Sequence, residues 1–173
     1  MSYANIPLGD NAPNECNVVV EIPKGSHLKY EYDEKTDVIK LDRVLHSAVF
    51  YPVNYGFLPQ TRSEDGDHLD VLLLLSEPVF PGCMVKAKPI GVLYMEDQGE
   101  KDEKIIAVAS SDPLLQHIND SEDIDDFLKK EIHHFFEIYK NLENKKVKVH
   151  HWHNREIAYN IIRESQKRFL KKG

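Results

Sequence analysis

The stretch CNVVVEIPKGSHLKYEYDEKTDVIKLD, residues 16–42, decides the fold class. It contains three runs rich in β-branched and aromatic residues, which predict strands at 16–22, 27–33 and 37–42. Further runs of the same kind follow at 69–75, 83–95 and 103–110. Strands this dense, with no helical pattern between them, favour an antiparallel sheet or a small closed barrel over alternating strands and helices.

The last third of the chain changes to a helical period. Apolar residues at spacings of three and four predict one buried helix face made of Ile124, Phe127, Leu128, Ile132, Phe135, Phe136 and Tyr139. We expect Ser121 to cap this helix, with Glu122 and Asp123 in its first turn.

A short strand is expected at 146–152, after that helix. Asn154 then caps a final helix whose inward face is Ala158, Ile161, Ile162 and Phe169. The whole pattern predicts an α+β fold, with a β core and a long helix packed against it.

Length and composition limit the class of protein. The 173 residues predict a single domain over 1–173, and 41% hydrophobic with 29% charged residues is ordinary for a soluble globular chain. The formal net charge of −7 argues against a general nucleic-acid binder. The longest apolar run, Val71 to Leu75, is far below the roughly 18 residues of a membrane helix.

Two further features predict a cytoplasmic location. No secretory signal is visible at the N-terminus. Cys16 and Cys83 suggest buried free thiols in a reducing compartment rather than a disulfide framework.

An acidic loop, SEDGDHLDV at 63–71, stands directly before an apolar strand. If Asp65, Asp67 and Asp70 converge, each pair about 4 Å apart repels by about 4 kcal/mol at an effective dielectric of about 20, so the cluster needs cations. The alternative is a solvated Asp-Gly turn. An EF-hand is excluded, because counting from Asp65 the sixth position is Asp70 instead of glycine and the twelfth is Ser76.

A second acid-rich segment, YMEDQGEKDEK at 94–104, also follows a predicted strand. It is either a solvated loop or a partner of the first loop at one end of a barrel. In the second case the hard oxygen ligands favour magnesium, manganese or calcium, and this many acids imply more than one ion.

Basic and phenolic side chains form a third group, which comprises Lys29, Arg43, Tyr51, Tyr55, Tyr139 and Lys140. Each alone is unremarkable, and YPVNYG at 51–56 is expected to be a shaped loop. Carboxylates together with such donors are what a metal–phosphate substrate requires.

These motifs make the chain resemble the soluble inorganic pyrophosphatases of the first family, in their short bacterial-type form. The resemblance runs nearly end to end, through KYEYD (29–33), DRVL (42–45), FYPVNYGF (50–57), DGDHLDV (65–71), IGVLYMED (90–97), GEKDEK (99–104) and HHFFEIYKNLE (133–143). It implies a five-stranded OB-like closed β-barrel flanked by two main C-terminal helices. It also implies a homohexamer, built as two trimers with the long helix in subunit contacts, that hydrolyses diphosphate to two orthophosphates.

The resemblance also implies roles for individual residues. Several Mg²⁺ ions would activate the attacking water, with Mn²⁺ or Zn²⁺ as possible substitutes. Asp65, Asp70 and Asp102 would bind the tighter metal pair, while Asp97 and Glu21 would support the ions that arrive with substrate. Asp67 would be the general base, and Glu31 would hold metal waters. The phosphate clamp would be Lys29, Arg43, Tyr55, Lys104, Tyr139 and Lys140, with Tyr51 at its border.

Position 68 departs from the family pattern, because His68 stands where proline is usual. Proline would fix φ and stiffen the loop. We expect the His68 side chain to turn outward with little effect, the alternative being an altered metal preference or pH profile.

Two other classes of protein and one other metal site compete with this interpretation. A non-catalytic OB-like module could bind a divalent metal with the acidic loops. A phosphohydrolase acting on nucleotides or polyphosphate would need a stacking platform or a longer basic groove, and no segment suggests either. His151 and His153 could hold zinc or nickel, although a surface cluster is the preferred interpretation.

Overall fold

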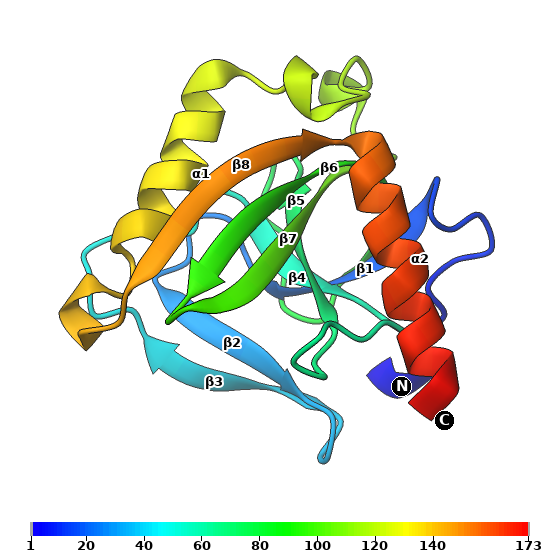
Figure 1. The fold of residues 1–173 in the computed structure, drawn as a ribbon, viewed down its shortest axis with the longest axis horizontal. Coiled ribbons are helices and arrows are strands. Elements are labelled where there is room, and N and C mark those ends of the chain that lie inside the picture. Colours follow the sequence, from blue (N-terminus) through cyan, green and yellow to red (C-terminus); the bar gives the residue numbers. More distant parts are fainter. Residues whose placement is uncertain (1, 173) are drawn as a thin grey trace.

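Five strands close a ring in the computed structural model, which describes residues 2–172 (Figure 1). Their order is β1 (Cys16–Ile22), β4 (Asn54–Leu58), β5 (Leu69–Leu74), β7 (Glu100–Ala109) and β6 (Met84–Asp97), and β1 also pairs with β6. The expected barrel is therefore confirmed. Its strands pair antiparallel except for β5 and β7, which run parallel.

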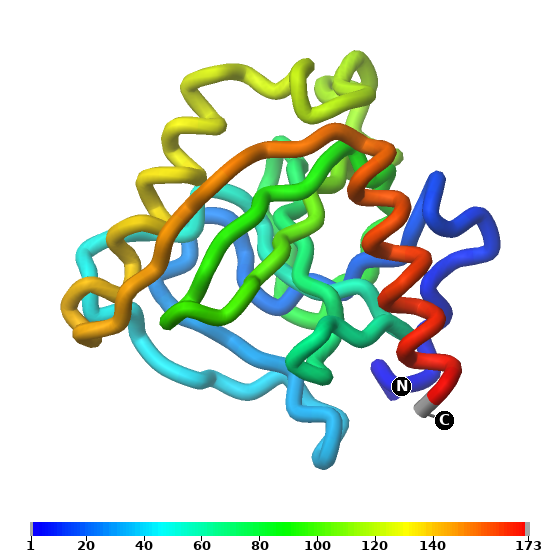
Figure 2. The backbone as a smooth tube through the Cα atoms, in the orientation of Figure 1, coloured from blue at the N-terminus to red at the C-terminus, as the bar shows by residue number. Residues whose placement is uncertain are grey.

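Three more strands and two helices surround the ring. β8 (Val147–Asn154) extends the sheet beyond β6, and β2 (Leu28–Asp33) forms a separate hairpin with β3 (Val38–Val44). The hairpin can be followed in Figure 2 to its turn, residues 34–37, at the bottom of the view. The helices are α1 (Asp126–Ile138) and α2 (Arg155–Lys172), with short 3₁₀ turns at Tyr3–Asn5, Pro113–Leu115, Ser121–Asp123 and Asn141–Glu143.

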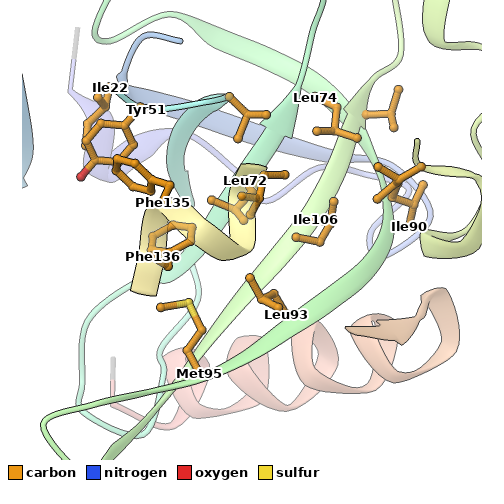
Figure 3. Close-up of a cluster of buried hydrophobic side chains, with 14 of the residues drawn as sticks. Ile22, Tyr51, Leu72, Leu74, Ile90, Leu93, Met95, Ile106, Phe135 and Phe136 are labelled. Atoms are coloured by element: carbon orange, nitrogen blue, oxygen red, sulfur yellow. The ribbon is translucent and has the colours of Figure 1, made fainter. Parts of the chain in front are cut away.

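The continuous apolar run in β5 reflects burial on both faces of the strand. Leu72 and Leu74 belong to the core that α1 covers, and Figure 3 shows Leu72 beside Phe135 and Phe136, with Leu74 farther from these rings. Val71 and Leu73 belong to the core that α2 covers. Because neighbouring strand residues point to opposite faces, a strand between two helix-covered cores must be apolar throughout.

One strand was not expected from the sequence. Residues 54–58 form β4, although YPVNYG suggested only a shaped loop. Gly56 explains why this strand was difficult to predict. A Cβ atom at position 56 would lie 2.0 Å from the carbonyl oxygen of Val19 on β1. Glycine usually weakens a strand, but here it lets two neighbouring strands approach closely.

The start of the long helix was also predicted wrongly. Ser121 begins a 3₁₀ turn that Asp120 and Asp123 close with a capping box, and Ile124 then returns to an extended conformation. The α-helix begins at Asp126, where the Asp125 carboxylate accepts hydrogen bonds from the amides of Phe127 and Leu128. By contrast, Asn154 caps α2 as expected, accepting from the Ile157 amide at 3.2 Å.

Most of the predicted inward residues are buried, with four exceptions: Phe127, Leu128, Phe169 and Cys83. Leu128 is partly buried against the core that α1 covers. Phe127 is 68% exposed, because α1 begins later than expected and its first turn lies outside the core. Phe169 is only partly buried near the end of α2. Cys16 is buried but Cys83 is partly exposed, and both thiols are free. Among the described residues, no helix combines the length and apolarity needed to cross a membrane.

Candidate active site

A cleft of about 850 Å³ opens between the β2–β3 hairpin, the loop before β5 and the β6–β7 turn. It brings together all but two of the side chains predicted from the sequence. Those lining it are Glu21, Lys29, Glu31, Tyr55, Asp65, Asp67, Asp70, Asp97, Asp102, Lys104, Tyr139 and Lys140. The acid-rich loops therefore do meet at one end of the barrel.

Lys104 is the cation at the floor of this cleft. It is 4% exposed, and its Nζ lies 2.5 Å from Asp70 Oδ2 and 2.6 Å from Asp102 Oδ1. Burial opposes the charge of the ammonium group, yet Asp70 and its other anionic neighbours hold the pKa of Lys104 well above its usual range. Burial also raises the pKa of the Asp70 carboxyl, against the opposing effect of Lys104.

The loop before β5 presents Asp65 and Asp67 to the cleft. Gly66 adopts φ +97°, and the Asp67 backbone amide donates to Asp65 Oδ1 at 2.9 Å. The Ser63 amide closes the turn by donating to the Asp67 carbonyl at 2.8 Å. Burial and the charges of Asp65 and Asp70 raise the pKa of Asp67. A base at this position therefore holds its proton more readily than an exposed aspartate.

Glu21 is a buried carboxyl on β1 at the same end of the barrel. Burial, followed by the nearby charge of Asp70, raises the pKa of Glu21 to about 8. Its Oε1 accepts a hydrogen bond from the Tyr32 amide at 2.7 Å. The site thus concentrates more negative charge than its own lysines neutralise.

The remaining donors stand around these acids. Lys29 contacts Glu31 and lies 3.3 Å from Asp42 Oδ2, while Lys140 contacts Asp97. Tyr139 is buried and Tyr55 is partly buried, and burial raises the pKa of each phenol, so both are neutral hydrogen-bond donors.

Arg43 and Tyr51 are the two predicted residues that do not line the cleft. Arg43 is the cross-strand neighbour of Lys29, and its guanidinium contacts Asp42 and, at 3.0 Å, Glu143 Oε1. Tyr51 packs edge-on against Tyr55, with ring centroids 5.7 Å apart.

Asp42 and Glu143 were missed as site residues. Each holds Arg43 in place, and each lies within a motif, DRVL or HHFFEIYKNLE, that the sequence already singled out.

The donor set fits divalent metal ions in its chemistry. No three His, Cys, Asp or Glu side chains within residues 2–172 converge closely enough to hold an ion as they stand, because the carboxylates contact lysine ammonium groups instead. In the same residues, Asp97 Oδ1 and Arg43 Nη2 are buried without a hydrogen-bond partner. A buried carboxylate oxygen and a buried guanidinium nitrogen without partners are what a metal and a phosphate would satisfy.

The predicted outward orientation of His68 is wrong. Its side chain is 13% exposed and stacks on Phe57, with ring centroids 4.8 Å apart. The Phe57 and Tyr32 rings stack on each other with centroids 5.1 Å apart, and the imidazole packs against both, 6.0 Å from the Tyr32 centroid. No pattern near position 68 predicts this packing.

The His151 and His153 rings of β8 lie 6.4 Å apart between centroids, and His153 also packs on the Tyr94 ring, with centroids 4.6 Å apart. Within residues 2–172, no third His, Cys, Asp or Glu joins them in a group that could hold a metal ion.

Known proteins match this chain closely in sequence and structure. The family model "Inorganic pyrophosphatase" matches residues 18–170. "Soluble inorganic pyrophosphatase 3" of Arabidopsis thaliana is 52% identical over 94% of this chain and 76% of its own length. The "Inorganic pyrophosphatase" of Saccharolobus solfataricus is 51% identical over 83% of this chain and 86% of its own. The crystal structure of the Thermus thermophilus enzyme superimposes with a TM-score of 0.95 at 44% identity, covering 98% and 99% of the two chains.

These matches define the class: the chain belongs to the soluble inorganic pyrophosphatases of the first family. Its activity is that of an inorganic diphosphatase, a hydrolase that cleaves inorganic pyrophosphate.

Proposed function

We propose that the enzyme hydrolyses magnesium pyrophosphate to two orthophosphates in this cleft, with Asp67 as general base. The observation that carries the proposal is the meeting of acidic and basic groups in one cleft, where Asp70 and Asp102 share the Lys104 ammonium. A substrate with several negative charges needs both kinds of group, because metals bind its oxygens and lysines neutralise the rest.

Asp65, Asp70 and Asp102 would hold the tighter pair of ions, and Asp97 and Glu21 the additional ones. Glu31 would hold metal waters. Bound Mg²⁺ supplies positive charge that polarises phosphate oxygens and makes water more acidic. The raised pKa values of Glu21 and Asp70, which burial causes, support these assignments, because bound cations would stabilise the ionised form of both buried carboxyls. Mn²⁺ and Zn²⁺ are candidate substitutes.

Asp67 accepts the proton of the attacking water in this proposal. A base within reach of the water needs only a modest pKa when the water is already acidic. The phosphate oxygens are bound by Lys29, Arg43, Tyr55, Lys104, Tyr139 and Lys140, and Tyr51 supports Tyr55 from behind.

The decisive experiment measures orthophosphate released from magnesium pyrophosphate by the wild type and by Asp67→Asn. We expect fast hydrolysis that needs Mg²⁺ and is largely lost in the variant. ATP and tripolyphosphate serve as competing substrates, and Mn²⁺ and Zn²⁺ as competing metals. A protein that binds Mg²⁺ but releases no orthophosphate with any of these metals would instead be a non-catalytic metal-binding barrel.

The proposal extends to assembly and location. We infer a homohexamer built through α1, because Phe127 exposes an aromatic ring on that helix. Light scattering should give six times the chain mass of 20.0 kDa. A cytoplasmic location is inferred from the free thiols of Cys16 and Cys83, which fit a reducing compartment. Fractionation of cells should find the enzyme there.

A further inference from the structure

The His68 side chain links two segments at the rim of the cleft. Its Nε2 lies 2.7 Å from Glu34 Oε1, and its Nδ1 lies 3.1 Å from the carbonyl oxygen of Thr61. The ring also stacks on Phe57 at an interplanar angle of 17°. The Glu34 and Thr61 partners are both hydrogen-bond acceptors, so a neutral imidazole donates to only one of them. Its other nitrogen can accept from Arg62 Nη1, which lies 3.3 Å from Nδ1 and 3.4 Å from Nε2. The imidazole is therefore held by polar contacts and by an aromatic face.

Glu34 has a second partner in Arg62. The Arg62 guanidinium donates from both terminal nitrogens to the two oxygens of Glu34, with Nη2 3.0 Å from Oε2. Such two-point pairing fixes orientation as well as distance. Glu34 lies in the turn of the β2–β3 hairpin, so the pair ties this turn to the loop before β5. Glu34, Arg62 and His68 are called the rim bridge below.

Helix α2 anchors the rim bridge at its other end. The Arg62 amide donates to the Ser165 carbonyl at 3.0 Å, and Arg168 Nε donates to the Arg62 carbonyl at 2.8 Å. The Arg62 guanidinium also lies over the Phe169 ring, 5.3 Å from its centroid. The rim bridge thus joins the β2–β3 hairpin to α2, the helix that covers the core containing Val71 and Leu73.

The segment held by the rim bridge carries Asp67. Gly66 gives this loop conformational freedom, and the residue after Asp67 has no proline ring to restrict it. The His68 side chain supplies a restraint at that position through Glu34 and Phe57. Small displacements of a catalytic group are costly, since about 1 Å can lower a rate by about a hundredfold.

We propose that the rim bridge positions Asp67 for catalysis, and that His68 does through its side-chain contacts what proline would do by fixing φ. This inference rests on the proposed role of Asp67 as general base. His68 and Glu34 are positioning residues, because they act through the loop backbone and not on the phosphates.

The test is a double-mutant cycle between positions 34 and 68, with kcat and KM measured on magnesium pyrophosphate. Glu34→Ala should lower kcat by about tenfold while KM changes by less than about twofold. Glu34→Gln, which keeps a side-chain acceptor, should recover part of that loss. In a His68→Pro background, Glu34→Ala should leave kcat unchanged, because the proline ring then restrains the loop by fixing φ at position 68.

Melting temperatures separate positioning from stability. Both proteins with Glu34→Ala lose the pair with Arg62, so both should melt lower by a similar amount, although only one loses kcat. The matched control is His150→Ala, which removes another His–Glu pair, His150 Nε2 to Glu96 at 3.2 Å, on β8 and away from α1. Its kcat should equal that of the wild type.

Two results would overturn the inference while leaving the proposed function intact. One is wild-type kcat in Glu34→Ala when Asp67→Asn is inactive. The other is an equal loss of kcat from Glu34→Ala in the His68 and His68→Pro backgrounds. Absence of pyrophosphate hydrolysis in the wild type would instead refute the proposed function itself.

Discussion

Asp70 and Lys104 are register partners across the parallel strands β5 and β7, and the Lys104 ammonium lies 2.5 Å from Asp70 Oδ2. Strand alternation places Asp102, two residues before Lys104, on the same face, so that one ammonium also reaches its carboxylate. A charge built into the barrel wall therefore holds two acids together. If the Lys104 ammonium were removed, the Asp70 and Asp102 carboxylates would repel each other without a positive charge between them.

Lys104→Met should destabilise the enzyme in the presence of EDTA. Removing one partner of a buried ion pair leaves an uncompensated charge, and we expect a loss of about 3 kcal/mol in the free energy of unfolding. This value is at the low end of the usual range because both carboxylates remain partly open to the cleft. Urea unfolding followed by circular dichroism measures it.

Added Mg²⁺ should recover more stability in Lys104→Met than in the wild type, since a divalent ion can replace the lost positive charge. Lys101→Met is the matched control: that lysine is on the same strand but half exposed, and its removal should cost less than about 1 kcal/mol. Equal losses in the two variants would contradict the proposed role of Lys104 in the wall.

Asp67→Asn should separate catalysis from metal binding. We expect kcat to fall by about 10²–10⁴-fold, the usual contribution of a general base, with little change in Mg²⁺ affinity. Asp65→Asn, two residues away, should instead weaken Mg²⁺ binding and regain much of its kcat at high Mg²⁺. Initial rates of hydrolysis measured across a Mg²⁺ titration distinguish the two variants. If high Mg²⁺ rescued Asp67→Asn as well, Asp67 would be a ligand and not the base.

Sequence patterns predicted the strands, and so an antiparallel sheet or a small closed barrel, because strands follow short-range rules; the resemblance to the pyrophosphatases implied the barrel and the roles of the acids. Alternating or continuous apolar runs mark strands, and residues at strand ends, such as Asp70 and Asp97, can meet at one end of a barrel, as these two do. The hardest strand was β4, since its glycine, proline and asparagine neighbours resemble a turn. The reason for Gly56 lies on another strand, at Val19, and no local rule contains it.

Side-chain partners distant in the sequence were the other limit. Nothing near His68 indicates that its ring stacks on Phe57 and contacts Glu34, which lies in the turn of the β2–β3 hairpin. Glu143 supports Arg43 across one hundred positions of sequence separation. Such contacts depend on the tertiary fold. A sequence motif can therefore single out Arg43 or His68, but it does not show which distant side chains contact them.

The corrected start of α1 can be tested directly. Asp125→Ala should lower the free energy of unfolding by about 1 kcal/mol, because its carboxylate accepts from the amides of Phe127 and Leu128. Asp126→Ala is the control: this neighbouring acid lies within the first turn and lacks the capping position, so its loss should cost about 0.5 kcal/mol or less. The reverse order of the two losses would place the cap elsewhere.

Glu21 should make the metal-free enzyme less stable as pH rises. Its pKa is about 8 in the folded protein and 4.5 for an ordinary glutamate, so between these values the folded state keeps a proton that the unfolded state has released. The stabilisation is fully present below about pH 4.5 and is lost as pH rises through about 8. A single group of this kind changes the free energy of unfolding by at most about 1.4 kcal/mol per pH unit.

Glu21→Gln should therefore flatten the decline between pH 5 and 8 in EDTA, as measured by urea unfolding at several pH values. The amide keeps the oxygen that accepts from the Tyr32 backbone, so the comparison removes the titration and preserves the hydrogen bond. Some decline should remain, because burial also raises the pKa of Asp70. With saturating Mg²⁺ the wild type should lose most of its pH dependence, since the cations favour the ionised carboxylates. An identical slope for wild type and Glu21→Gln in EDTA would show that Glu21 is ionised in the folded protein without any metal.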